Sequence, residues 1–163
     1  MSLLSDKNWE KAMPFTVSIF IGLLLGFMLS RGTITYIEQI DNLVDVGVTF
    51  SSTLLGFLGV LIGILFTIRE TKTGTILFNL EKFAILKEYL KTSIESGFYT
   101  LAFTVFLNLY SWECIEQIFL NLSPNDVVII LWTMIAGYFI ASSWRVMSIM
   151  IAILFSKPKN YER

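Results

Sequence analysis

The chain is short of the residues that most enzymes and metal centres need. Its 163 residues include no histidine, one cysteine and three prolines, and only 15% are charged. Without histidine there is no imidazole general base, no histidine-based triad and no imidazole metal ligand. The lone Cys114 excludes an intrachain disulfide. We therefore expect a protein that is not an enzyme and that has no catalytic residue, no metal site and no cofactor.

The chain is instead rich in apolar residues. Hydrophobic residues make up 55% of the chain and aromatic residues 15%, and the mean hydropathy is +0.69. This composition is typical of a membrane domain and is too apolar for a soluble domain of this length. The formal net charge of -1 creates no general attraction to nucleic acid, so direct nucleic-acid binding is not expected.

Charged residues delimit four hydrophobic segments. They cover residues 12–30, 46–68, 96–112 and 127–145. Each has about 17 to 25 residues, the length that a helix rising about 1.5 Å per residue needs to cross hydrocarbon. Leu29-Ser30-Arg31 lacks a small-x-small cleavage site, which favours an uncleaved span over a signal peptide. The sequence predicts an all-α polytopic membrane protein, with one domain over 1–163 and four transmembrane helices.

Basic residues are unevenly distributed among the segments outside these spans. They occupy the N-terminus, the segment between the second and third spans, and the C-terminal tail, whereas Arg31 is alone in the two other connections. Those two connections are acidic, with Glu38, Asp41 and Asp45 in the first and Glu113, Glu116 and Asp126 in the second. Because lysine and arginine accumulate on the cytoplasmic side, both termini are predicted to be cytoplasmic.

The fourth span has a defined start and ends at a charge. Ser123-Pro124-Asn125-Asp126 predicts a serine N-cap, a proline in the first turn and an acid three residues after the cap. From Val127 to Arg145 the rise is about 27 Å, close to the hydrocarbon thickness of about 30 Å. Trp144 and Arg145 are therefore interpreted as an anchor at the inner interface, where the arginine reaches the headgroups. The alternative is a buried gating or binding charge.

Apolar residues also extend beyond the inner ends of the spans. Residues 146–155 contain neither glycine nor proline, and the segment before the third span repeats apolar residues at helical spacing: Ile76, Phe83, Leu86, Leu90 and Ile94. We predict a cytoplasmic helical layer over 74–95 and 146–156. The favoured form is a stalk that runs directly into the third span and packs on the tail of the fourth; the alternative is a helix lying on the bilayer. Candidate docking residues for a soluble partner are Lys82, Lys87 and Lys91.

Small residues recur every three or four positions in the first two predicted helices. They are Ser18, Gly22, Gly26 and Ser30 in the first, and Ser52, Gly56, Gly59 and Gly63 in the second. Such faces let helix backbones approach closely in lipid, where packing replaces the hydrophobic driving force. We expect these two faces to pack on each other within one chain, and an intersubunit seam in a homo-oligomer is the alternative.

The third predicted helix carries a polar face of Thr100, Thr104 and Asn108. This face either lines a conduit in an oligomer or is satisfied internally, with the hydroxyls bonded back to their own helix and Asn108 joined to a neighbouring span. The spans contain no aligned charged ring and no central acid, so the sequence gives little support to a selective ion filter or a proton-coupled carrier.

Two stretches, SSTLLGFLGVLIGILF and NLEKFAILKEYLKTSI, resemble a group of small four-pass bacterial membrane proteins that are common in defence islands. Within this group, the two stretches are similar to the membrane subunit of the Kiwa anti-phage system. The likeness covers residues 51–110 and includes no catalytic motif, so no functional residue is carried over. It implies an oligomeric protein of the bacterial inner membrane that senses phage attack and holds a soluble partner on its cytoplasmic face.

Two functions are consistent with these features. The favoured one is a non-enzymatic, oligomeric sensor or scaffold of the inner membrane, whose partners are the lipid bilayer, further copies of the chain and a soluble cytoplasmic protein. The alternative is a pore-forming effector or channel that depolarises the membrane, which the glycine faces and the polar third helix favour. A membrane enzyme or transporter has the least support, because histidine, the commonest general base, and membrane-buried charges are lacking.

Overall fold

The structure, a computed structural model, describes residues 3–31, 40–69, 81–109 and 123–154. These stretches form four long helices: α1 (Leu3–Ser30), α2 (Ile40–Arg69), α4 (Glu81–Leu109) and α5 (Pro124–Leu154). The shortest has 28 residues and the longest 31, so each is about 42 to 46 Å long. The predicted all-α class is confirmed for the described residues.

Three of these helices are long and apolar enough to cross a membrane. The qualifying stretches are Ala12–Ser30 in α1, Asn42–Thr67 in α2 and Pro124–Ile151 in α5. They coincide with the first, second and fourth predicted spans and support the assignment to a membrane. Helix α4 differs because it carries charges as far as Glu95, and the uncharged part that remains, 96–109, rises only about 20 Å against the roughly 30 Å of a bilayer core. The end of the third predicted span, 110–112, lies outside the described residues.

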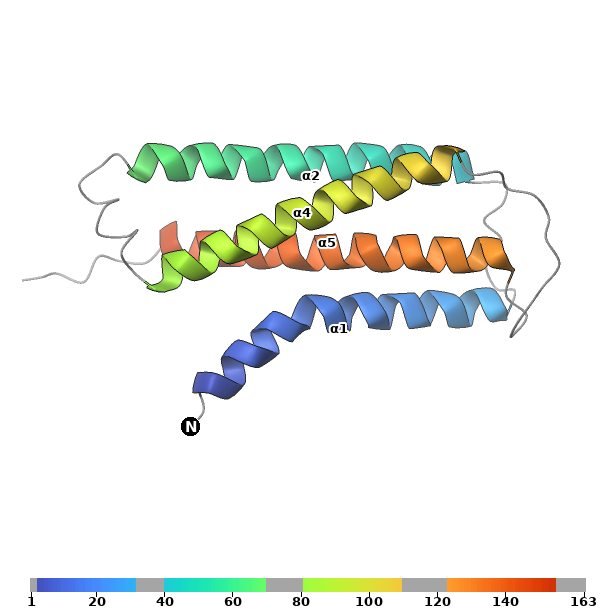
Figure 1. The fold of residues 1–163 in the computed structure, drawn as a ribbon, viewed down its shortest axis with the longest axis horizontal. Coiled ribbons are helices and arrows are strands. Elements are labelled where there is room, and N and C mark those ends of the chain that lie inside the picture. The colour runs from blue at the N-terminus through green and yellow to red at the C-terminus, as the bar shows by residue number, and fades with distance from the viewer. Residues whose placement is uncertain (1–2, 32–39, 70–80, 110–122, 155–163) are drawn as a thin grey trace, which may run out of the picture.

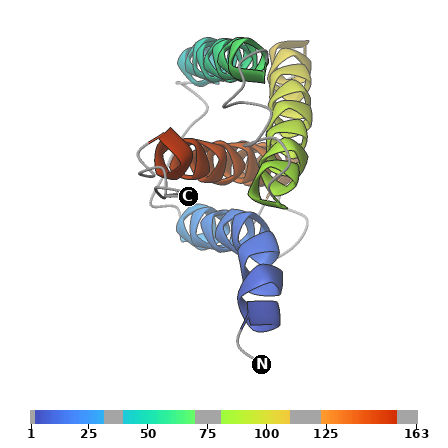
Figure 2. The same ribbon diagram turned by 90° about the vertical axis from the view of Figure 1, so that its left-hand side faces the viewer.

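The helices form one elongated bundle in which each runs antiparallel to the helix it packs on (Figure 1). Helix α1 packs on α5, α5 on α4, and α4 on α2. Helices α1 and α2 therefore lie at opposite edges of the bundle, with α4 and α5 between them (Figure 2). This order places α5 in the centre, and it separates the two helices that carry the small-residue faces.

The small-residue faces consequently do not pack on each other, contrary to expectation. An ideal Cβ at Gly22 would lie 2.4 Å from Cγ of Met134, and one at Gly26 would lie 3.3 Å from Cδ1 of Ile130, so the face of α1 is closed by α5. On α2, by contrast, an added Cβ at Gly56, Gly59 or Gly63 would meet no heavy atom within 4 Å. The α2 face is therefore open in the single chain.

Local sequence explains the start of α5 and the shape of α1. The predicted capping arrangement is confirmed, since the Asp126 amide donates to Ser123 Oγ at 3.2 Å and the Ser123 amide donates to Asp126 Oδ2 at 2.6 Å. Pro14 lies inside α1, which bends in its first half (Figure 1). Proline lacks the amide hydrogen that a regular helical turn needs, and its ring crowds the carbonyl four residues earlier, so the helix bends.

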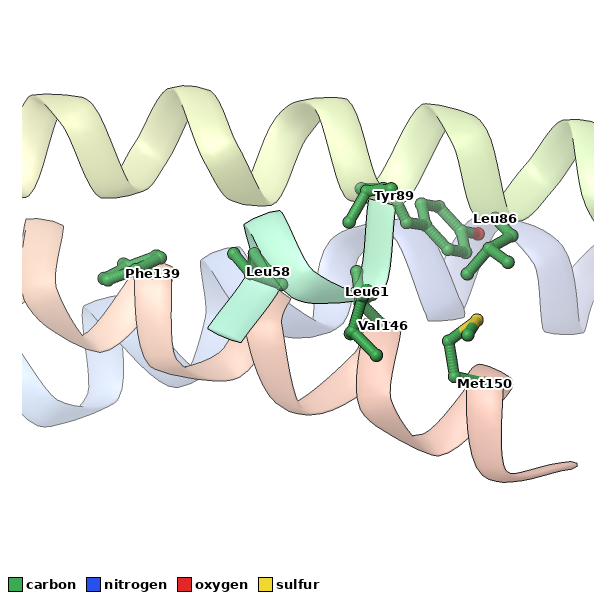
Figure 3. Packing of buried hydrophobic residues seen from close by; sticks show 8 residues of the cluster. Leu58, Leu61, Leu86, Tyr89, Phe139, Val146 and Met150 are labelled. Carbon is green, nitrogen blue, oxygen red and sulfur yellow. The ribbon is translucent and has the colours of Figure 1, made fainter. Parts of the chain in front are cut away.

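The main hydrophobic cluster joins α2, α4 and α5 (Figure 3). Its buried members are Leu58 and Leu61 of α2, Leu86, Tyr89 and Leu90 of α4, and Phe139, Val146 and Met150 of α5. Val146 and Met150 lie beyond Arg145, so this core continues past the charged end of the predicted fourth span. Helix α4 runs without a break from Glu81 into the predicted third span, as a stalk would. Residues 74–80 and 155–156 of the predicted layer lie outside the described residues.

Substitution of Gly97 tests the tight crossing of α4 with its two neighbours. A Cβ there would lie 2.6 Å from Leu55 Cδ2 and 2.7 Å from Phe139 Cε2, so Gly97→Ala should destabilise the bundle by about 1–3 kcal/mol through overpacking. The matched control, Gly59→Ala on the open α2 face, should be neutral or stabilising by up to about 1 kcal/mol, because alanine is the better helix former. Unfolding in mixed detergent and SDS, followed by tryptophan fluorescence, measures both. Equal midpoints for the two variants would contradict this packing.

Candidate functional site

Polar side chains gather along the seam between α4 and α5. Helix α4 contributes Ser93, Ser96, Thr100 and Thr104, and α5 contributes Ser142 and Ser143; each is at most 6% exposed. Steps of three, four and seven residues place these α4 hydroxyls on one face of the helix, which faces α5. This hydroxyl-bearing face of α4 is therefore enclosed within the chain.

Four of these residues form a serine cluster, made of Ser93, Ser96, Ser142 and Ser143. Ser93 Oγ lies 2.8 Å from Ser143 Oγ and 3.4 Å from Ser142 Oγ. Ser96 Oγ lies 3.3 Å from Ser142 Oγ and donates to the carbonyl of Ser93 at 2.9 Å. Each hydroxyl thus has a partner, and small side chains at these positions let the two helices approach closely. The cluster joins the helices, and no imidazole exists in the chain to activate a serine as a nucleophile.

The seam continues toward the other end of the bundle through two threonines and a tryptophan. Thr100 and Thr104 donate to the carbonyls four residues earlier, at 2.8 and 2.7 Å. Trp132 of α5 then donates its indole N–H to Thr104 Oγ1 at 2.8 Å. Both threonine hydroxyls therefore bond back to their own helix, which is the second of the two alternatives predicted for this face. The third member of the predicted polar face, Asn108, is exposed and lines a separate hollow of about 390 Å³ with Asp45 of α2.

Arg145 lies at the end of the seam that is predicted to be cytoplasmic. It donates from Nη2 to the Tyr89 hydroxyl at 2.6 Å, and its guanidinium carbon lies 3.6 Å from the centre of the Tyr89 ring. A hydrogen bond and a cation–π contact to one side chain restrain the guanidinium more than a free surface arginine. Trp144 is 65% exposed on the outside of the bundle, as an interface anchor would be. Arg145 itself is half-buried and held by α4.

The predicted docking lysines lie on the stalk part of α4. Lys87 and Lys91 are exposed, and Lys91 Nζ lies 3.6 Å from Glu95 Oε1. An exposed pair four residues apart on a helix contributes little to stability, about 0.3–0.5 kcal/mol, so the fold does not depend on it. The backbone of Lys82 belongs to α4, but its side chain lies outside the described residues.

The serines of the two small-residue faces lie at the two edges of the bundle, on α1 and on α2. On α1, Ser18 is buried and donates to the carbonyl of Met134 at 2.6 Å, which adds a polar contact to the glycine face on α5. Ser30 donates to its own helix, at the carbonyl of Phe27. On α2, Ser52 is exposed and donates to the carbonyl of Val48. Ser18, Gly22 and Gly26 of α1 thus make contacts between helices, whereas Ser30 of α1 and Ser52 of α2 are satisfied within their own helices.

Sequence reasoning missed several members of the seam between α4 and α5, and three of the missed residues, Ser142, Ser143 and Tyr89, carried a signal. Ser142 and Ser143 are adjacent hydroxyls in an otherwise apolar stretch, a pattern that indicates a polar contact between helices. Tyr89 lies three residues after Leu86, on the same apolar face of α4, and could have been assigned to the lone arginine of α5. For Trp132, only the structure shows the hydrogen bond to Thr104.

The described contacts of the site join helices to one another. Among the described residues there is no group of three histidine, cysteine, aspartate or glutamate side chains that could hold a metal ion. No protein-family model, no curated protein and no solved structure matches the chain.

The hydrogen bond between Trp132 and Thr104 should contribute measurably to the seam. We expect a coupling energy of about 0.5–2 kcal/mol between Thr104→Val and Trp132→Phe, in the range for hydrogen bonds between transmembrane helices. Thr53→Val is the matched control, because Thr53 is exposed and bonds only to the Thr49 carbonyl of its own helix. A double-mutant cycle of unfolding in SDS gives the coupling. Additive effects of the two substitutions would show that the bond contributes nothing.

Proposed function

We propose that the protein is a non-enzymatic, oligomeric four-pass scaffold or sensor of the bacterial inner membrane that docks a soluble partner on its cytoplasmic end. The observation that carries this proposal is the packed core that continues beyond Arg145. From Arg145 to Leu154 helix α5 rises about 13 Å, and from Glu81 to Tyr89 helix α4 rises about 12 Å. Leu86, Val146 and Met150 are buried between these ends. A rigid apolar core outside the bilayer provides a platform for a partner.

The course of the chain supports a fourth crossing by α4. Helices α2 and α5 both run antiparallel to α4 and therefore begin at the same end of the bundle (Figure 1). If both cross the membrane, the chain between them has to return, and α4 packs on both of them, at an oblique angle to α2 (Figure 1). The hydroxyls of Ser93, Ser96, Thr100 and Thr104 face α5 and are bonded, so these polar atoms are not presented to lipid. The basic termini and the basic segment before α4 then lie together on the cytoplasmic side.

The exposed charges of the stalk indicate the chemistry of the partner. Lys87 and Lys91 are one helical turn apart and exposed, so they present two ammonium groups on one side of α4. Such groups steer an acidic surface and restrict its orientation. The likeness of residues 51–110 to membrane proteins of defence islands favours a partner in anti-phage defence, and sensing of phage attack is the corresponding activity of the scaffold.

Charge reversal of the stalk tests the docking proposal. Lys87→Glu with Lys91→Glu should remove most of a soluble partner that co-purifies with the wild-type chain from its native host, because the lysines then repel an acidic surface. The control, Lys7→Glu with Lys11→Glu, makes the same charge change on α1 and should retain the partner. Labelling of Cys114 with an impermeant thiol reagent in intact cells checks that the orientation is unchanged. Equal capture by both variants, with Cys114 labelled in each, would refute the contact.

The open face of α2 supports self-association. Gly56, Gly59 and Gly63 have no contact within 4 Å at the position of a Cβ, so the close approach that these glycines permit is not used inside one chain. We propose that a second copy packs there, as small-residue faces do in membranes. This use differs from that of the α1 glycines, which are already covered by α5.

A bulky residue on this open face should break the assembly without unfolding the chain. Gly59→Leu is expected to lower the number of chains per complex, measured by native mass spectrometry from mild detergent, because the side chain holds the second backbone away. Val46→Leu is the control, since Val46 is an exposed residue of α2 outside the glycine face. The unfolding midpoint in SDS should change little, as nothing in the same chain is displaced. An unaltered complex mass would place the interface elsewhere.

A conducting pore is the weaker proposal for this chain. The residues expected to line it, Thr100 and Thr104, are at most 2% exposed and face α5 of the same chain. A conduit would have to use other surfaces, because water in a pore requires polar groups that are accessible. Asn108 is the exposed member of that face, and it is close to the end of α4.

A further inference from the structure

The two edges of the bundle, formed by α1 and α2, expose stripes of opposite character (Figure 2). The side chains of Phe20, Leu24 and Phe27 on α1 are 50–68% exposed and recur at steps of four and three residues, so they form one stripe, the α1 stripe. Leu24 is two residues from both Gly22 and Gly26, which is about 200° around a helix. Because those glycines pack on α5, the α1 stripe points away from the bundle.

The edge formed by α2 carries a stripe of small and polar residues, the α2 stripe. Its members also recur at steps of four and three residues, and all are exposed: Asp45, Thr49, Ser52, Gly56, Gly59 and Gly63. This alternation is the spacing of a seam between two packed helices. An added Cβ at any of the three glycines would meet no heavy atom within 4 Å, so the backbone there is accessible. The bulky side chains of one edge are therefore complementary in shape to the other edge.

Opposite charges lie at one end of the two stripes. Helix α1 ends and α2 begins at the same end of the bundle (Figure 1). Arg31 follows α1 and Asp45 opens the α2 stripe, and both are exposed. The guanidinium carbon of Arg31 lies 4.3 Å from the centre of the Phe27 ring, so this charge is folded back along α1. Asp45 and Thr49 line the hollow of about 390 Å³ beside α4, which leaves space for a guanidinium next to the carboxylate.

Contacts with α5 place these two charges at the same depth of the bundle. The Cβ position of Gly26 is 3.3 Å from Ile130 Cδ1, and that of Gly47 is 2.9 Å from Trp132 Cζ2. These two α5 residues are about 3 Å apart along the helix axis, so the two glycines lie at nearly the same level. The ring that holds the guanidinium and the carboxylate at the start of the α2 stripe are each within two residues of these glycines. The charges are therefore level to within about one helical turn.

The middle parts of the two stripes are also level. Ile21 of α1 lies against Gly137 of α5, with its Cδ1 atom 3.2 Å from the Cβ position of that glycine. Leu55 of α2 lies at the level of Phe139 of α5, because both contact the Cβ position of one glycine of α4. The two α5 residues are again about 3 Å apart along the axis. Phe20 is therefore at the depth of the middle of the α2 stripe.

We propose that copies of this chain associate edge to edge, with the α1 stripe of one copy packed antiparallel on the α2 stripe of the next. Arg31 of the first copy then pairs with Asp45 of the second. Copies with one orientation in a membrane are related by rotation about its normal, which keeps every residue at its own depth, so the matched levels bring these charges together. Because the two contacting surfaces differ, the copies close into a ring.

This arrangement rests on the self-association proposed above and names the surface of the second copy that covers the glycines of α2. The other possible pairing, of two α2 stripes, brings two Asp45 carboxylates to the same level, where like charges repel. It also leaves the exposed side chains of the α1 stripe uncovered. Pairing of the two different edges removes the repulsion and uses both stripes.

Disulfide cross-linking tests which edges meet. In a Cys114→Ser background, the chain with both Phe20→Cys and Ser52→Cys is oxidised in its native membrane. The two cysteines lie on opposite edges of one chain and cannot bridge within it. We expect a ladder of dimers, trimers and larger species on non-reducing SDS gels, because each copy is joined at both edges. The chains with one cysteine, Phe20→Cys or Ser52→Cys, are the controls and should remain monomers.

Charge exchange tests the ion pair. Arg31→Asp and Asp45→Arg should each lower the fraction of assembled chains about tenfold, measured by native mass spectrometry from mild detergent, because like charges then meet. The variant with both substitutions should restore assembly, since the pair is formed in reverse. Both residues are exposed in the single chain, so the unfolding midpoint in SDS should stay near the wild-type value. Labelling of Cys114 with an impermeant thiol reagent in intact cells checks that the orientation is unchanged.

Three results would overturn this arrangement. Dimers formed by Ser52→Cys alone would place two α2 stripes against each other, so self-association would stand with another geometry. A ladder from the chain with two cysteines, without rescue by the double charge variant, would refute the ion pair. A wild-type chain that is monomeric in native mass spectrometry and gives no cross-links would reject the proposed self-association itself, and this arrangement with it.

Discussion

Helices in lipid gain little from burying apolar side chains against one another, so this bundle depends on close backbone approach and internal hydrogen bonds along α5. Small residues supply both. The glycines of α1 bring its backbone against Met134 and Ile130, and the serine cluster brings α4 to the other side. Because α5 takes both contacts, α1 and α4 are held apart.

Arg145 divides the bundle into two chemical environments. On one side of it the α4–α5 seam is held by hydroxyls, as expected where lipid surrounds the helices. On the other side Leu86, Val146 and Met150 continue the hydrophobic cluster that begins with Leu58 and Phe139 inside the predicted spans. Burial of such side chains stabilises a helix pair most where the surrounding solvent is water. Tyr89 joins the two environments by holding the guanidinium against α4. The proposed docking platform lies beside this residue.

Much of the bundle was predictable because hydropathy and capping act locally. The three apolar helices and the start of α5 at Pro124 follow from composition and from Ser123 and Asp126. The pairing of helices was not predictable, since a glycine face shows that some backbone can approach without showing which one. Gly22 and Gly59 look alike in sequence, yet one is closed by Met134 and the other is open. For the same reason the sequence shows that Thr104 is polar, but it does not show that Trp132 is its hydrogen-bond partner.

The sequence by itself determined the helices, their apolar lengths and the uneven distribution of lysine and arginine, because these depend on residues close together in the chain and on their preference for water or lipid. Tertiary structure alone decided that α5 lies at the centre, that the polar face of α4 is enclosed, and that Arg145 meets Tyr89. Those outcomes depend on contacts between residues far apart in the chain, such as Ser93 with Ser143. Several pairings of four apolar helices satisfy the same hydropathy pattern, and the fit of side chains between helices selects one of them.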